Sequence, residues 1–500
     1  MPSPSRRLIV VSNRLPVVLR RGEDGWELKP GSGGLVTALA PALSHRGGLW
    51  IGWPGVAVKP GEPWEELLAS GFRERGYELV PVLLSQEEVE GFYYGFSNSV
   101  LWPLFHDMTG SCDFAPRFWY SYLEVNRKFA DRVVAHTAED DFVWVQDYQL
   151  INVAERMRER QAARHIGFFL HIPFPPLDIF TKLPWRGQIL GALLAYDLIG
   201  FQTPRDLRNF LSCLSHLLPE IAIGEDQGGV VALSVGDRRV TAGAFPIGID
   251  YREFHDVAAD PETDQRMGDL RGKIGGYDIV LGVDRLDYTK GLPERLLAFA
   301  NAIERYPALR ERVILLQIVV PSRESVSEYQ TLKDQLDRLV GQINGQFSTA
   351  GWTPIHYHYR SLARRDLISL YRMGRVGFVT STKDGMNLVS KEYVACQIDR
   401  CGTLVLSEFA GAAAQLADGA LLVNPHDIEG MADALVRALD MSEDERRGRM
   451  ERMQRVISEQ DIFWWVDRFL SVALGSNLAD LTAPRDFVPA IDTGESWIDL

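Results

Sequence analysis

Cysteine is scarce in this chain of 500 residues, which has no long apolar run and no surplus of basic residues. Its four cysteines form no C-x-x-C pair. Cys396 and Cys401 stand five apart without a second pair or a nearby histidine, which argues against a structural zinc site. We expect reduced thiols, mostly buried, in a reducing compartment.

No apolar stretch approaches the ~20 residues that a membrane-spanning helix needs. The run LIVV near the start is too short for a signal peptide, so we expect a cytoplasmic protein without a membrane partner. The formal net charge of −14 argues against a nucleic-acid partner, because phosphate backbones are bound by clustered Lys and Arg. Any site for a small phosphorylated substrate must then be a local basic pocket.

Short apolar runs alternate with segments of helical spacing, first in one half of the chain and then again in the other. The predicted strands are 7–12, 48–51, 142–145, 165–171, 279–283, 313–320, 355–359, 376–381 and 403–406. The predicted helices include 119–134, 153–163, 292–305, 325–343 and 461–473. This alternation predicts an α/β protein with parallel sheets covered on both faces. A turn-rich junction is expected near 243–251, with a ligand in the cleft at the carboxyl ends of the strands.

Basic residues follow several of the predicted strands. Arg285 and Lys290, in VDRLDYTKGLPER, stand five apart after a strand and predict a clamp for a diphosphate. Glu294 and Arg295, just beyond, are expected on a solvated helix face. Arg323 follows the next strand, and an arginine there suits a phosphate that is bound bidentately.

Three further positions could face the cleft, each with a structural alternative. Arg14 ends the first strand, although it could be a surface residue beside a turn. The glycines of 31–34 precede a helix, where backbone N–H groups can approach an anion, although such turns are common. His171 closes a strand before a proline-stiffened loop and could bind a sugar or the nearby backbone.

The segment DGMNLVSKE predicts a turn that opens a helix near Met386 or Asn387. Glu392 lies about two turns in, where it could reach a ribose diol. The alternative is a helix cap at Asp384 and a surface glutamate at 392. No paired Asp motif follows a strand, and Asp140 with Asp141 precedes one, so we expect a transfer that needs no metal.

The blocks VSNR, GSGGL, GFSNSVLWP, QDYQL, FFLHIPFP, VDRLDYTKGLPER, DGMNLVSKEYV and LSEFAGAA occur in this order. With them the chain resembles the trehalose-6-phosphate synthase family from about residue 7 to 475. The resemblance implies the GT-B fold, in which two Rossmann-like domains face a central cleft. The expected division is 1–245 for an acceptor-binding domain, 246–460 for a nucleotide-sugar domain, 461–475 for a helix packing back on the first, and 476–500 for a poorly ordered tail.

The resemblance also implies a retaining glycosyltransferase that moves glucose from a nucleotide-glucose, expected to be UDP-glucose, to glucose 6-phosphate. No cofactor and no metal are expected. The base is met largely by backbone, so GDP- and ADP-glucose remain alternatives. The implied acceptor contacts are Arg14, Tyr93, Trp102, Asp147 and Arg323. The implied donor contacts are Gly33, Gly34, His171, Arg285, Lys290, Leu362, Asp384, Gly385, Met386, Asn387, Leu388, Val389 and Glu392, with Arg285, Lys290, His171 and Asp384 taking part in catalysis.

Departures from the family pattern are small. Many members have HDYHL where this chain has QDYQL, and the aromatic pair at Tyr93 and Tyr94 leaves open which of the two contacts the acceptor. A glucosylglycerol-phosphate synthase using glycerol 3-phosphate and a non-catalytic regulatory member remain alternative readings. The sequence leaves the oligomeric state open, a homo-oligomer included.

Overall fold

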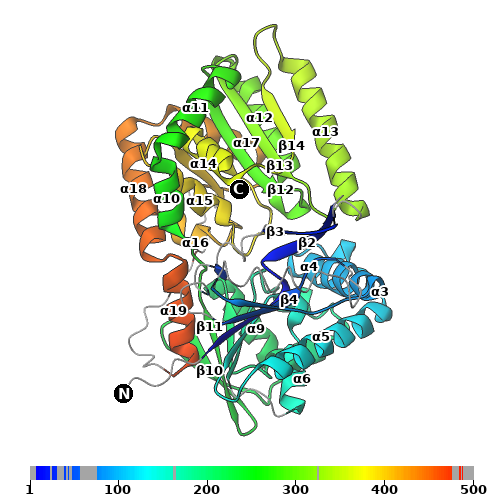
Figure 1. The fold of residues 1–500 in the computed structure, drawn as a ribbon. Helices are drawn as coiled ribbons and strands as arrows, with labels where there is room; N and C mark the ends of the chain where they lie inside the picture. The colour runs from blue at the N-terminus through cyan, green and yellow to red at the C-terminus, as the bar shows by residue number, and fades with distance from the viewer. Residues whose placement is uncertain are drawn as a thin grey trace, which may run out of the picture.

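The computed structural model describes residues 7–22, 25–30, 39–40, 43, 48–56, 76–160, 165–323, 326–475, 484, 485 and 487. Two β-sheets lie one above the other in Figure 1, each flanked by helices. The strands of the lower sheet all come from residues 8–244, and those of the upper sheet from residues 278–423. The division at residue 245 stays a prediction.

The lower sheet has nine strands in the order β5-β4-β1-β6-β7-β8-β11-β10-β9. Their bounds are β1 (Leu8–Arg14), β4 (Leu49–Trp53), β5 (Glu78–Pro81), β6 (Phe142–Gln146), β7 (His165–Phe169), β8 (Leu198–Phe201), β9 (Ala222–Asp226), β10 (Val230–Val235) and β11 (Arg238–Ala244). The first six of these strands and β11 run parallel, whereas β10 and β9 are antiparallel additions that the sequence did not predict. Every residue of the outermost strand, β9, is exposed.

The upper sheet has six parallel strands in the order β14-β13-β12-β15-β16-β17. Their bounds are β12 (Asp278–Arg285), β13 (Val313–Val320), β14 (Ile355–Tyr359), β15 (Val376–Val379), β16 (Thr403–Ser407) and β17 (Leu421–Val423). The predicted strands of this half match them closely, because strands buried on both faces are nearly continuous apolar runs.

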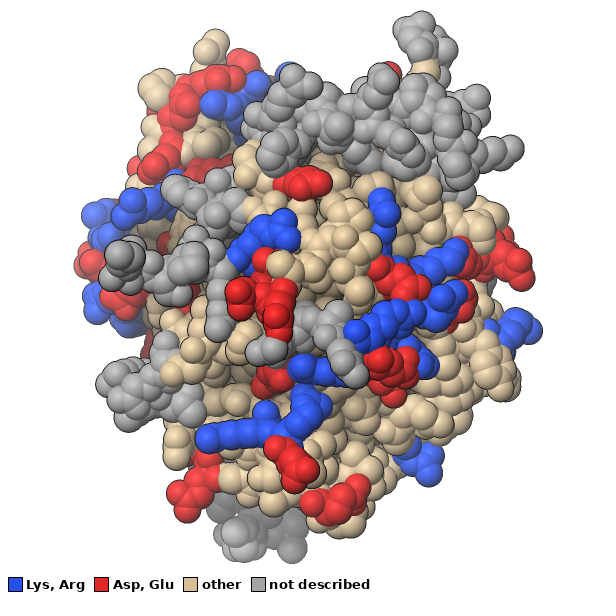
Figure 2. Space-filling view, turned by 60° about the horizontal axis from the view of Figure 1, so that its bottom comes forward, with Lys and Arg blue, Asp and Glu red and all other residues tan. Residues whose placement is uncertain are grey.

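Helices cover both sheets. The main ones are α5 (Pro116–His136), α6 (Val153–Glu159), α8 (Arg186–Leu193), α9 (Pro204–Leu217), α10 (Tyr251–Ala259), α11 (Pro261–Ile274), α12 (Leu292–Arg305), α13 (Ser327–Phe347), α14 (Arg364–Met373), α15 (Leu388–Cys396), α17 (Ile428–Asp440), α18 (Glu443–Glu459) and α19 (Ile462–Ala473). None of the helices in the described part of the chain is both long and apolar enough to cross a bilayer. On the face in Figure 2, basic side chains alternate with acidic ones.

Each sheet contains a point at which the strand order reverses. In the lower sheet, β1 has β4 on one side and β6 on the other, and in the upper sheet β12 lies between β13 and β15 in the same way. Both orders follow the doubly wound pattern, whose ligands bind outside the carboxyl ends of the strands at the reversal. Arg14 ends β1 and Arg285 ends β12, so the fold places both arginines at these points.

A π-helix, η1 (Val89–Leu101), joins the short helix α4 (Trp102–Phe105) beside the lower sheet. Side chains provide hydrogen bonds to backbone carbonyl oxygens of this helix. Asn98 Nδ2 donates to the Tyr93 carbonyl oxygen at 2.8 Å, and Ser99 Oγ donates to that of Tyr94 at 2.7 Å. Long π-helices are rare and often occur at functional sites. Here the element carries Tyr93 toward the end of β1.

Helix α19 leaves the upper half of the molecule and lies along the lower sheet (Figure 1). Trp465 is fully buried there, with its ring centroid 4.8 Å from that of Trp144 and 4.9 Å from that of Phe169. Its Nε1 donates to the carbonyl oxygen of Phe245 at 3.1 Å. The last helix therefore joins the two halves of the chain.

Replacing Trp465 by alanine should destabilise the protein by about 3–5 kcal/mol, because it opens a cavity between α19 and the lower sheet. Calorimetry on Trp465→Ala should show a clearly lowered melting temperature. Trp464→Ala is the control, since the Trp464 side chain is only partly buried. Equal melting temperatures for the two variants would contradict the account of α19.

Candidate functional site

Three arginines converge on Tyr93 at the end of β1. The Arg14 guanidinium lies 4.4 Å from the ring centroid of Trp53 and 5.4 Å from that of Tyr93. Burial raises the pKa of the Tyr93 phenol, but the charges of Arg323, Arg14 and Arg285 together lower it below its usual value. Because these cations come from both halves of the molecule, the cluster is a local basic site in an acidic protein.

Arg323 reaches this cluster from the upper half with a left-handed backbone, φ +48°. Its guanidinium lies 4.5 Å from the ring centroid of Trp102. It also donates to the hydroxyl of Tyr329 at 2.5 Å and to that of Tyr148 at 3.4 Å. Neutral hydroxyls and rings hold the arginine in place without cancelling its charge, which leaves it suited to bind an anion.

Asp147 follows β6 on the other side of the order reversal, with φ at +74°. Its Oδ1 accepts the backbone N–H of His171 at 3.1 Å. Burial raises the pKa of Asp147 to about 6, although hydrogen bonds from Tyr148 and His171 and the charges of Arg285 and Arg323 lower it. A partly buried carboxylate beside two cations can accept hydrogen bonds from sugar hydroxyls.

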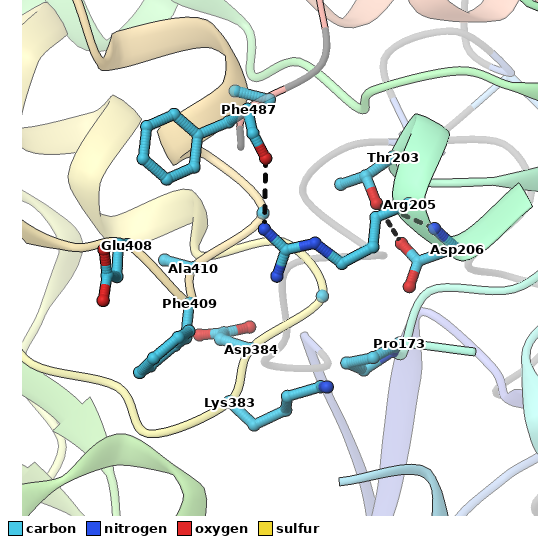
Figure 3. Close-up of a pocket in the computed structure, with 13 residues that line it drawn as sticks. Pro173, Thr203, Arg205, Asp206, Lys383, Asp384, Glu408, Phe409, Ala410 and Phe487 are labelled. Carbon is cyan, nitrogen blue, oxygen red and sulfur yellow. Dashed lines mark hydrogen bonds between the residues drawn. The ribbon is translucent and has the colours of Figure 1, made fainter. Parts of the chain in front are cut away.

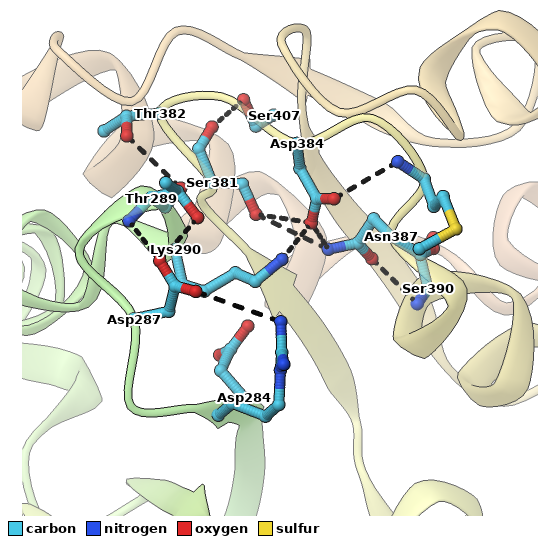
Figure 4. Close-up of polar contacts among 12 residues, drawn as sticks. Asp284, Asp287, Thr289, Lys290, Ser381, Thr382, Asp384, Asn387, Ser390 and Ser407 are labelled. Atoms are coloured by element: carbon cyan, nitrogen blue, oxygen red, sulfur yellow. Dashed lines mark hydrogen bonds and ion pairs between the residues drawn. The ribbon is translucent and has the colours of Figure 1, made fainter. Parts of the chain in front are cut away.

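A second polar cluster lies at the ends of β12 and β15 (Figure 4). Lys290 Nζ donates to Asp384 Oδ2 at 2.5 Å, and the same carboxylate accepts from Asn387 Nδ2 at 3.1 Å and from the Met386 N–H at 3.2 Å. Burial alone would raise the pKa of Asp384, but Lys290 and these hydrogen bonds lower it, so the group is ionised.

Arg285 is half exposed in the cleft, with Nη2 3.9 Å from Asp287 Oδ2.

Asn387, rather than Asp384, caps the helix that follows. It adopts φ +60° and accepts the Ser390 N–H at 3.0 Å, so α15 begins at Leu388, followed by Val389. The structural alternative of a cap at Asp384 is therefore wrong. Glu392, one turn into the helix, accepts a hydrogen bond from the Tyr371 hydroxyl at 2.8 Å, and burial raises its pKa.

Gly385 brings the two halves of the molecule together. A Cβ at this position would lie 2.5 Å from the carbonyl oxygen of His171. Only a glycine therefore lets the turn after β15 approach the loop after β7. Nearby, Lys383 Nζ of the upper half pairs with Asp107 of the lower half at 2.6 Å.

Two of the predicted donor contacts, Gly33 and Gly34, lie outside the described residues. Leu362 lies between β14 and α14, partly buried against the core, and its backbone is not seen to join either cluster. The prediction of a solvated Arg295 is wrong. Its side chain is fully buried, pairs with Asp284 and donates to Thr380 Oγ1 at 3.0 Å, because α12 turns this face onto the sheet.

His106 is a cleft residue that the sequence analysis missed. Its ring centroid lies 4.2 Å from that of Trp102, and its Nδ1–H donates a hydrogen bond to the Trp102 carbonyl oxygen at 2.7 Å. Burial lowers the pKa of His106 to about 4, while Asp287 and Asp384 raise it and Lys290 lowers it. Its position four residues after Trp102 was the only sequence signal.

A pocket opens between the halves beside the Lys290–Asp384 cluster (Figure 3). Arg205 and Asp206 of α9 line one side, and Asp384, Gly385 and Glu408 line the other. The described residues contain no group of three or more His, Cys, Asp or Glu side chains placed to hold a metal ion.

Comparison with known proteins gives consistent results. The sequence profile of glycosyltransferase family 20 matches residues 6–473. The trehalose-6-phosphate synthase of Mycolicibacterium vanbaalenii is 44% identical over 470 residues, which cover 92% of this chain and 94% of the relative. That of Mycobacterium tuberculosis strain H37Rv is 42% identical over 481 residues, or 94% of this chain and 95% of the relative.

Solved structures are equally similar. A UDP-forming α,α-trehalose-phosphate synthase of Burkholderia xenovorans, in complex with glucose 6-phosphate, superposes with a TM-score of 0.85 at 37% identity, covering 94% of this chain and all of that one. An Escherichia coli structure bound with UDP-2-fluoro glucose has a TM-score of 0.83 at 38% identity, covering 93% and 98%. The predicted GT-B fold, with two Rossmann-like sheets facing a cleft, is confirmed.

The raised pKa of Asp147 should make the stability of the protein depend on pH. Its pKa is about 6 in the folded protein and 3.8 ordinarily, so the folded state holds the proton more tightly. Stability from this group is therefore greatest below about pH 4 and is lost as the pH rises to about 6, by at most about 3 kcal/mol.

Asp147→Asn removes this ionisation. Its melting temperature relative to wild type should rise as the pH increases from 5 to 7, measured without substrates. Asp237→Asn, at the exposed turn between β10 and β11, is the control for the loss of one charge. A difference between Asp147→Asn and wild type that stays constant over this range would contradict the prediction.

Proposed function

The chain belongs to glycosyltransferase family 20, and from this premise we propose that it transfers glucose from UDP-glucose to glucose 6-phosphate with retention, releasing UDP and α,α-trehalose 6-phosphate. The observation that carries the proposal is the placement of two arginines from opposite halves on aromatic rings, Arg14 at 5.4 Å from Tyr93 and Arg323 at 4.5 Å from Trp102. Two guanidinium groups held in this way, in a chain of net charge −14, indicate a site for phosphate groups.

The acceptor would lie at the carboxyl ends of β1 and β6. Arg323 would bind its phosphate bidentately, and the Trp102 ring would pack on the sugar. Asp147 would accept hydrogen bonds from sugar hydroxyls, and Arg14 with Tyr93 would close the site. The solved Burkholderia xenovorans relative, which is described as a complex with glucose 6-phosphate, supports this choice of acceptor.

The donor would lie against the upper sheet. Arg285 and Lys290 would neutralise the diphosphate, with Gly33 and Gly34 beside it. The donor glucose would contact His171, Asp384 and the backbone of Gly385–Asn387. The nucleotide would meet Leu388, Val389 and Glu392, with the base near Leu362. UDP is supported by the UDP-forming relative and by the UDP-2-fluoro glucose bound in the other.

The two carboxylates that are assigned to the donor already have partners, Asp384 with Lys290 and Glu392 with Tyr371. We therefore assign the nucleophilic role to neither. The acceptor hydroxyl attacks the anomeric carbon on the face from which UDP departs, and its proton passes to the leaving phosphate oxygen. Arg285 and Lys290 stabilise the negative charge that grows on the diphosphate. No metal is assigned to this step, and we place the reaction in the cytoplasm.

A panel of donors and acceptors tests the substrates. UDP-, GDP- and ADP-glucose are each combined with glucose 6-phosphate, glycerol 3-phosphate and free glucose, and nucleotide release is measured. We expect the highest kcat/KM for UDP-glucose with glucose 6-phosphate. Faster release with glycerol 3-phosphate would favour a glucosylglycerol-phosphate synthase. No release with any pair would favour a non-catalytic member of the family.

Two arginine variants should separate chemistry from acceptor binding. Arg285→Ala should lower kcat by roughly 10²–10³-fold, because it removes charge stabilisation from the departing diphosphate. Arg323→Ala should instead raise the KM for glucose 6-phosphate by about tenfold or more, because a charge-assisted phosphate contact is lost. Arg437→Ala is the control, since that side chain is 63% exposed on α17. An unchanged kcat in Arg285→Ala would contradict the role assigned to Arg285 in stabilising the departing diphosphate.

A further inference from the structure

Between residues 165 and 475, where nearly every residue is described, the chain crosses from one half of the molecule to the other at two places, and the two crossings touch. The first runs through residues 245–250 and the second through Gln460 and Asp461. A Cβ on Gly248 would lie 2.3 Å from the carbonyl carbon of Asp461, and the Ile462 N–H donates to the Ile249 carbonyl oxygen at 3.0 Å. Any change in the angle between the halves must act on these two segments.

A chain of hydrogen bonds runs from the first crossing into the lower half. The Ile247 N–H donates to Gln202 Oε1 at 3.0 Å, so the amide nitrogen of Gln202 must face the other way. That nitrogen lies 3.2 Å from His171 Nδ1, which therefore accepts, and the ring must carry its proton on Nε2. His171 Nε2 donates in turn to Gln146 Oε1 at 2.9 Å. The amides thus fix one tautomer of His171.

The same peptide is held from the upper half. Lys391 Nζ donates to the Ile247 carbonyl oxygen at 2.5 Å and to Gln415 Oε1 at 2.5 Å. Gln415 Nε2 donates to Gln460 Oε1 at 2.6 Å, at the second crossing. Lys391 is buried in α15, one residue before Glu392. The ammonium group of Lys391 therefore connects helix α15 directly to the first crossing and, through Gln415, to the second.

These contacts form one connected path, which we term the hinge relay: Gln146, His171, Gln202, Ile247, Lys391, Gln415 and Gln460. All of its members except Gln460 are buried. Gln146 Nε2 at its lower end has no hydrogen-bond partner in the described part of the chain. The relay therefore ends in an unused buried donor group at the carboxyl end of β6, next to Asp147.

We propose that Gln202 and Lys391 are positioning residues for the glucosyl donor, which act through the two faces of the Ile247 peptide. Gln202 keeps His171 neutral with its proton on Nε2, and Lys391 sets the position of α15 relative to the lower sheet. This inference rests on the proposed function, in which His171 and α15 contact the donor. Neither residue touches the substrates in that arrangement.

The surroundings of His171 agree with a neutral ring. Gln146, Gln202 and the aromatic rings of Phe169 and Trp465 pack against it, and burial lowers its pKa to about 3. The Asp147 carboxylate meets His171 at its backbone N–H, which donates to Oδ1 at 3.1 Å. The cation of Lys391 likewise contacts two neutral oxygens, and burial lowers its pKa to about 7.

The first test reads the tautomer directly in the wild-type protein. Nitrogen-15 NMR of the histidine side chains, with the His171 signal assigned by its loss in His171→Asn, should show a neutral ring protonated on Nε2 from pH 5.5 to 8. Protonation on Nδ1, or a charged ring at pH 7, would overturn the assignment to Gln202. This measurement needs no substrate, so its outcome is independent of the proposed function.

The second test replaces Gln202. In Gln202→Glu the carboxylate cannot donate to Nδ1 and favours a charged ring, so kcat/KM for UDP-glucose should gain an ionisation between pH 5 and 8. Gln202→Met should lower kcat/KM by about tenfold without that ionisation, because a buried acceptor loses its donor. Gln335→Glu, on the exposed face of α13, is the control for charge. Identical pH profiles in Gln202→Glu and Gln202→Met would overturn the proposal.

The third test asks whether Gln202 and Lys391 act through one peptide. Lys391→Met should raise the KM for UDP-glucose by about tenfold and leave the KM for glucose 6-phosphate unchanged. Combined with Gln202→Met, the loss in kcat/KM should be smaller than the product of the two single losses, as for residues in one network. A loss in kcat/KM of the double variant equal to the product of the two single losses would overturn the coupling. A change in KM for both substrates would also overturn it. Inactivity of wild type with every substrate pair would instead overturn the proposed function.

Discussion

The burial of Trp465 is the contact on which the relation of the two sheets depends. Helix α19 follows the last helix of the upper half, yet its aromatic face packs on Trp144 and Phe169 of the lower sheet. Its indole nitrogen also donates to Phe245, at the start of the first crossing. The end of the chain thereby fixes the segment that leads from one sheet to the other. The cleft between them takes its shape from this contact.

Charge in the cleft is arranged so that cations stay available although the protein is acidic. Aromatic rings and hydroxyls hold Arg14 and Arg323, and these partners orient a guanidinium without neutralising it. Lys290 differs, because it is paired with Asp384. A diphosphate that binds there must compete with that carboxylate. In the proposed function, the two sides of the cleft would therefore differ in their affinity for phosphate.

The sequence predicted the strand-end residues well because parallel strands place their carboxyl ends at one edge. Arg14, Arg285 and Arg323 could be located in this way, whereas Asp147 came only from the family resemblance and Asp384 from the turn that precedes a helix. The burial of Arg295 could not be predicted in this way. It depends on which face of α12 packs on the sheet, and the partner Asp284 lies 11 residues away in the sequence. The sequence also could not predict the tautomer of His171. It depends on Gln202, a residue that belongs to no motif and approaches only through the order of the strands.

The exposed strand β9 has a consequence for the surface of the lower sheet. Its outer edge pairs with no other strand among the described residues and could accept a strand from another molecule. The strand reads AIGED, and its last two residues, Glu225 and Asp226, are exposed carboxylates. Charged side chains on an edge strand disfavour such pairing. The antiparallel strands β10 and β9 thus end the lower sheet with an edge whose exposed carboxylates disfavour aggregation.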